Sequence, residues 1–109
     1  MMNTNTLKPE IEIVELGRIH VDTATMMMVD PMYVYDPEWV DQIGDQLRGL
    51  EFGRCISLNN SSVVMIRTGF GDGSYRVTLE IVDCGKRGKR VKSSTITFIE
   101  DEELEQHLN

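Results

Sequence analysis

The sequence is poor in the residues that crosslink exported domains, bind metals or carry out nucleophilic catalysis: its 109 residues include only two cysteines and two histidines. Cys55 and Cys84 are far apart and lack the short spacing of a metal-binding pair, so we expect reduced thiols in a cytoplasmic protein. No apolar run approaches the ~20 residues of a transmembrane helix, and residues 1–9 lack the apolar segment of a signal peptide. The chain is therefore predicted to be cytoplasmic, without membrane association, and to begin with a flexible tail over residues 1–9.

Catalytic motifs are equally scarce. His20 and His107 are the two histidines, and neither a Gly-x-Ser-x-Gly motif nor a cysteine-centred one supplies a partner for them. The glycine-rich run of residues 69–73 has the composition of a phosphate-binding loop, but such loops open a helix, and the residues that follow alternate like a strand. The sequence therefore favours a protein that is not an enzyme, and it predicts no cofactor.

Basic side chains are few and unevenly placed. Residues 86–92 contain five of the eleven and no acid, so the other 102 residues carry six basic and eighteen acidic side chains, a charge of −12. Such a body repels nucleic-acid phosphates, and we expect no general binding to nucleic acid. The basic segment has two interpretations: a solvated hairpin end attracted to the acidic side chains of residues 100–105, or a binding site for a small anionic ligand.

One helix is clearly indicated, near residues 37–48. Asp36, Pro37 and Glu38 have the order of an N-cap, a first helical residue and a first-turn acid. The apolar residues that follow have helical spacing and form one stripe: Trp39, Val40, Ile43 and Leu47.

Alternating apolar residues predict strands in the rest of a core over residues 10–100. Gly17 is expected to break the first strand, and residues 25–29, apolar on both faces, to form a central one. The strands expected after the helix make an antiparallel meander: residues 55–58, 62–68, 74–82 and 90–99. We predict one α+β domain over residues 1–109: a twisted antiparallel β-sheet or open barrel of about six strands, one packed helix, and an acidic tail over residues 101–109.

Asp72-Gly73, between two alternating runs, is a strong signal for a two-residue β-hairpin turn, because both residues tolerate the positive φ of a type I′ turn. The register that this turn sets pairs apolar residues of the two strands on one face: Phe70 with Tyr75, Thr68 with Val77, Ile66 with Leu79, and Val64 with Ile81. Arg67 and Arg76 would then share the opposite face.

Two arginines on one sheet face repel each other unless an anion lies between them. Arg67 could form an ion pair with Glu80 while Arg76 points to water, an arrangement of little energetic consequence. Alternatively, the two guanidiniums hold one carboxylate or phosphate bidentately, assisted by basic side chains of the next loop. The candidate ligand-binding residues are Arg67, Arg76, Lys86, Arg87, Lys89 and Arg90, and the expected ligand is nucleotide-like.

Aspartates near turns are candidates for a metal site, which is a second type of chemistry. Carboxylates from several loops can bind Ca²⁺ or Mg²⁺ when backbone carbonyls complete the shell, and the candidates are Asp22, Asp30 and Asp72. Their spacing matches no metal-binding loop, and Asp30 and Asp72 are also explained as strand-end and turn residues. A metal-assisted hydrolase is therefore the alternative to a binding protein.

A third hypothesis is a structural subunit that forms homo-oligomers. The chain has seven methionines, and Met26–Met28 are consecutive; such residues fill a core or form an adaptable binding surface. Trp39, Tyr33 and Tyr35 offer aromatic area of the kind found at binding hot spots. Exposed strand edges or methionines would then join the copies.

The segments Val21-Asp22-Thr23, Asp30-Pro31-Met32-Tyr33 and Gly-Phe-Gly-Asp-Gly-Ser-Tyr-Arg-Val at residues 69–77 together resemble an uncharacterised family of small β-rich proteins encoded by bacteria and their phages. The family pattern is Val-Asp-Ser/Ala-Gly, Asp-Pro-Cys-Tyr and Gly-Asp-Gly-x-Tyr-Pro-Val, and the chain departs from it at Ala24, Met32 and Arg76. The resemblance implies a compact antiparallel β domain of bacterial or phage origin and brings no established activity. We therefore expect a non-enzymatic binding module that sequesters a small anionic ligand or blocks a partner protein.

Overall fold

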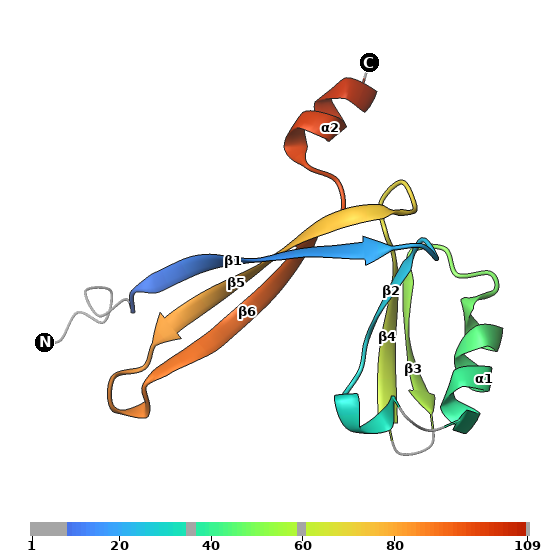
Figure 1. Ribbon diagram of the computed structural model, residues 1–109, viewed down its shortest axis with the longest axis horizontal. Helices are drawn as coiled ribbons and strands as arrows, with labels where there is room; N and C mark the ends of the chain where they lie inside the picture. Colours follow the sequence, from blue (N-terminus) through green and yellow to red (C-terminus); the bar gives the residue numbers. More distant parts are fainter. Residues whose placement is uncertain (1–8, 35–36, 59–60, 109) are drawn as a thin grey trace, which may run out of the picture. The chain divides into compact units, whose positions relative to one another are not determined.

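The computed structural model describes residues 9–34, 37–58 and 61–108 (Figure 1). The predicted N-cap Asp36, Tyr35 and most of the predicted N-terminal tail lie outside these residues. The chain forms two compact units: unit 1 is Met1–Ile19 with Ser74–Asn109, and unit 2 is His20–Gly73. Among the described residues, no helix combines the length and apolar character needed to span a bilayer.

Unit 1 is built on a three-stranded sheet in the order β1-β5-β6, with strands β1 (Ile11–Val21), β5 (Gly73–Asp83) and β6 (Lys89–Thr97). β5 and β6 pair antiparallel, with a bulge between Glu80 and Ile81. The short 3₁₀ helix η3 (Gly85–Arg87) joins them, and helix α2 (Asp101–His107) follows β6. β1 is continuous through Gly17, whose φ of 146° shows that the predicted break is instead a local irregularity within one strand.

The β5–β6 pair has one apolar and one largely polar face, because side chains alternate along a strand. Val77, Leu79 and Ile81 of β5 lie opposite Ile96, Ser94 and Val91 of β6, while Arg76, Thr78 and Glu80 lie opposite Thr97, Thr95 and Ser93. Tyr75 and Phe98 stack edge to face with ring centroids 5.4 Å apart. Tyr75 is the only buried residue in the described part of unit 1.

Unit 2 contains a second three-stranded sheet in the order β2-β4-β3, with strands β2 (Thr25–Met28), β3 (Gly53–Leu58) and β4 (Ser61–Arg67). The 3₁₀ helix η2 (Pro31–Tyr33) and helix α1 (Pro37–Leu47) connect β2 to β3, so the helix predicted near 37–48 is present. The core of unit 2 consists of Ile43, Leu50, Val63 and Met65, and Val29, Leu47 and Ile56 pack against it. β2, predicted to be central, is an edge strand.

The α+β class and the antiparallel pairing are confirmed, but the strands form two sheets instead of one meander or barrel. The Asp72-Gly73 hairpin is wrong: β4 pairs with β2 and β3, and β5 with β1 and β6, so neither strand has a free edge for the other. The positive φ angles fall on Gly69 and Gly71, and the Asp72 carboxylate accepts a hydrogen bond from the Ala24 N–H at 2.8 Å. Residues 68–72 are thus a connection between sheets.

Ala24 is the only non-glycine residue with a positive φ in the described ranges, at 54°. We expect Ala24→Gly to raise the free energy of unfolding by about 1 kcal/mol, because the left-handed conformation brings Cβ close to the following carbonyl oxygen. Urea unfolding measures the change. Gly44→Ala in α1, where a new Cβ meets nothing within 4 Å, serves as a control that should stabilise by a similar amount. A lower free energy of unfolding in the Ala24→Gly variant would contradict the expectation that the positive φ strains Ala24.

Candidate functional site

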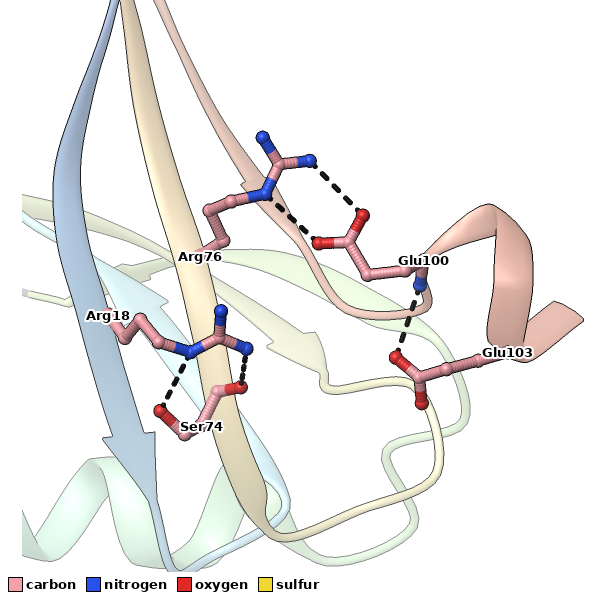
Figure 2. A network of polar contacts seen from close by, with 5 residues as sticks. All are labelled: Arg18, Ser74, Arg76, Glu100 and Glu103. Carbon is pink, nitrogen blue, oxygen red and sulfur yellow. Dashed lines mark hydrogen bonds and ion pairs between the residues drawn. The ribbon is translucent and has the colours of Figure 1, made fainter.

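Arg76 connects the polar face of the unit 1 sheet to the start of α2 (Figure 2). Its Nε and Nη2 donate to the two carboxylate oxygens of Glu100 at 3.0 and 3.1 Å, a bidentate pair whose side chains are 38% and 31% exposed. Glu100 is the N-cap of α2 and forms a capping box with Glu103, whose side chain accepts from the Glu100 N–H. The Arg76 guanidinium is therefore occupied by a carboxylate of its own chain.

The interactions between Arg76 and Glu100 shift the pKa values of both groups. The hydrogen bonds from Arg76 lower the pKa of Glu100, a smaller effect of burial opposes them, and the charges of Arg76 and then Arg18 lower it further. The pKa of Arg76 is raised, mainly by the same hydrogen bonds and then by the charge of Glu100. Arg18, which the sequence did not single out, donates to the Ser74 Oγ at 3.2 Å and to its backbone carbonyl at 2.8 Å (Figure 2).

Arg67 has a structural environment of a different kind, inside unit 2. Its Nε donates to the Leu50 carbonyl at 3.0 Å, its Nη1 to the Thr25 hydroxyl at 2.9 Å, and its Nη2 to the Leu47 carbonyl at 3.4 Å. Leu47 is the last residue of α1, where carbonyls lack intrahelical donors and a positive charge is favoured. Arg67 thus stabilises the end of α1 against the sheet.

The predicted relations of Arg67 do not form. Glu80, its expected ion-pair partner, accepts from the Ser93 hydroxyl at 3.0 Å and lies 3.9 Å from the Lys92 ammonium. Arg67 and Arg76 belong to different sheets, so the shared hairpin face on which the anion clamp depended is absent. A cavity of about 310 Å³ borders Arg67, but Glu51 lines it too, and an anion there would meet a carboxylate.

The other four predicted ligand-binding residues are brought together at the turn between β5 and β6. Lys86 and Arg87 lie in η3 and Lys89 and Arg90 begin β6; all four are exposed, and we call them the basic hairpin end. Asp83 fixes the turn by accepting a hydrogen bond from the Gly85 N–H at 2.8 Å. Within the described part of the chain, no ion pair engages these four side chains.

Helix α2, which follows the end of β6 away from the β5–β6 turn, contains most of the acidic residues of the 100–105 segment (Figure 1). We call Glu100, Asp101, Glu102, Glu103 and Glu105 the acidic segment. Residues 91–97, the seven residues of β6 that follow Arg90, separate it from the basic hairpin end by at least about 23 Å at the usual rise of a strand, about three times the Debye length of about 8 Å at physiological salt. The expected attraction between these two segments within one chain is therefore wrong.

The candidate metal ligands are held by separate local contacts. Asp22 lies 2.9 Å from the His20 Nε2, Asp30 accepts from the Met32 N–H at 3.0 Å and caps η2, and Asp72 binds Ala24. In residues 9–34, 37–58 and 61–108, no group of three or more His, Cys, Asp or Glu residues is arranged to hold a metal ion.

No family model, no curated protein and no solved structure matches this chain. The resemblance to small β-rich bacterial and phage proteins therefore stays a prediction.

Arg67→Ala is expected to lower the free energy of unfolding by about 1–3 kcal/mol, because it removes the donors that satisfy the Leu50 and Leu47 carbonyls. Urea unfolding measures the loss. The control is Arg54→Ala, whose guanidinium makes an exposed hydrogen bond to Gln46 and should change stability by less than about 0.5 kcal/mol. Equal effects of the two substitutions would rule out this anchoring role.

Glu100 is expected to titrate below the ordinary glutamate pKa, and its pKa should return toward that value in Arg76→Gln. Because its pKa is lowered in the folded state, the pair stabilises the fold above the ordinary glutamate pKa, and this stabilisation is lost as the pH falls through the lowered pKa. Carboxyl NMR titration measures both proteins, with Arg48→Gln as the control that leaves Glu100 unchanged. An unshifted Glu100 in Arg76→Gln would exclude Arg76 as the cause.

Proposed function

We propose that this protein is a non-enzymatic binding module whose basic hairpin end binds an acidic surface of a partner protein. The observation that carries the proposal is the group of four exposed cations, Lys86, Arg87, Lys89 and Arg90, which form no ion pair in the described part of the chain. Their guanidinium and ammonium groups can form charge-assisted hydrogen bonds to carboxylates, bidentate ones from the arginines. The protein would act by binding alone, because it would cover the surface of its partner.

The geometry of this end favours a protein surface over a nucleotide. The cavity at its base has a volume of about 180 Å³, below the ~300 Å³ of ordinary small-molecule sites. Glu10, Glu12 and Asp83 line that cavity together with Lys89, so a phosphate entering it would face three carboxylates. The basic side chains are instead exposed at a hairpin turn, where a flat acidic surface can reach several of them at once.

The probe for this proposal is fluorescently labelled poly-glutamate, with binding followed by anisotropy. We expect binding that weakens as salt is raised and falls about tenfold in the double variant Arg87→Gln/Arg90→Gln, which removes two of the four cations. The matched control is Arg48→Gln/Arg54→Gln, which removes the same charge from unit 2 and should bind like the unchanged protein.

Two outcomes would contradict the proposal. Equal losses in both double variants would show that only net charge matters. Calorimetric titrations with mono-, di- and cyclic nucleotides test the small-ligand alternative: binding of a nucleotide without binding of poly-glutamate would favour a small anionic ligand.

A further inference from the structure

We infer that the acidic partner surface is the acidic segment of a second copy of this chain, and that two copies pair antiparallel through the apolar face of the unit 1 sheet. This inference rests on the proposed function for the role of the basic hairpin end and adds the identity of the partner. Two independent features of unit 1 carry it: an uncovered apolar sheet face and a separation of charge along the strands.

Within the described part of unit 1, no second layer covers the apolar face of the sheet. An antiparallel sheet with one apolar face normally packs that face against another layer. Val77, Leu79 and Ile81 of the central strand are only half-buried, and Val91 beside them is 61% exposed. Leu16 of β1 borders the same groove as Val77 and is exposed as well. The core cluster lies wholly in unit 2, and α2 contributes no buried residue.

The charges of unit 1 are arranged so that a second copy can neutralise them. The basic hairpin end includes the start of β6 and the acidic segment follows the end of this strand, at least about 23 Å away. A two-fold axis that runs midway between two stacked sheets, parallel to their planes and perpendicular to the strands, brings their apolar faces together with the strands reversed. Each basic hairpin end then lies at the same end of the stack as the partner's acidic segment, and this opposition of charges occurs twice. A parallel arrangement would instead place like charges together, which costs free energy.

The size of the face indicates a modest affinity. Strands of eleven, eleven and nine residues give a sheet of about 500 Å² in projection, which places the interface toward the small end of stable complexes. Apolar contact alone is then a weak determinant of orientation. The paired charges at both ends therefore decide which arrangement forms.

A charge-reversal experiment on the full chain tests this arrangement. Lys86→Glu/Arg87→Glu/Arg90→Glu gives the hairpin end a charge of −2, and Asp101→Lys/Glu102→Lys/Glu105→Lys gives the acidic segment a charge of +1; all six positions are exposed. By sedimentation equilibrium at micromolar concentration, the unchanged protein should have twice the 12.4 kDa mass of one chain, and each of these two charge-reversal variants alone should have the mass of one chain. An equimolar mixture of the two should form a heterodimer, because both contacts are again complementary. The chain carrying all six changes should form homodimers again.

A second pair of variants tests the apolar face. Val91→Ser should raise the dissociation constant at least about tenfold, because the side chain occurs twice in a two-fold interface. Phe52→Ser is the matched control, since Phe52 is an exposed apolar residue of unit 2 and its removal should leave the dimer unchanged.

The outcomes separate this inference from the proposed function. A monomer that binds poly-glutamate through Arg87 and Arg90 would overturn the second-copy inference and leave the proposed function standing. A dimer that both charge-reversal variants retain, or a mixture that stays monomeric, would overturn the antiparallel arrangement. A monomer that binds no poly-glutamate would overturn both.

Discussion

An antiparallel sheet with one apolar face needs a second layer, and the described part of unit 1 supplies none. In unit 2 the corresponding requirement is met: Val63 and Met65 of the central strand are fully buried beneath residues of α1 and the segment that follows it. In unit 1 the central strand β5 carries equally apolar side chains, yet only Tyr75 is buried. The hydrophobic stabilisation available to this sheet is therefore largely unrealised within the unit, and a covering surface from another molecule would supply it.

Arg67 and Arg76 show that the chemistry of a residue can be predicted correctly while the group that it binds is predicted wrongly. Arg76 does hold a carboxylate bidentately, and Arg67 does bind several oxygen acceptors, but all of these acceptors belong to the chain itself. A sequence shows which donor groups are present, but it does not show which acceptors the fold brings to them. Because both guanidiniums are engaged, an external anion would have to displace an internal oxygen. The exposed cations of the basic hairpin end, which form no ion pair in the described part of the chain, are therefore better candidates for the proposed binding surface than Arg67 and Arg76.

The parts of the fold that depend on local signals were predictable. Helix α1 follows from a proline, a first-turn acid and one apolar stripe, and the pairings of β3 with β4 and of β5 with β6 join neighbouring strands. The partners of β4 and β5 across the Asp72-Gly73 connection were not predictable, because alternating residues look the same in a hairpin and in two strands of separate sheets. Pairings such as β1 with β5 and β2 with β4 span long stretches of chain and leave no local signal. The basic hairpin end was found because its residues are contiguous, whereas the clamp required a register that the fold does not adopt.

The separation of charge in unit 1 and its apolar face arise from different parts of the sequence, yet they favour the same assembly. The charges come from residues 86–92, which include the start of β6, and from residues 100–105, which follow its end, and the apolar face comes from alternation within β5 and β6. Two chains that each carry −7 repel each other at long range, so most mutual orientations are disfavoured. The proposed antiparallel arrangement would place each group of cations at the same end as the partner's acids while it covers both apolar faces. Repulsion between the acidic surfaces of the two chains then disfavours every contact of the apolar face except the one in which the charged ends are complementary.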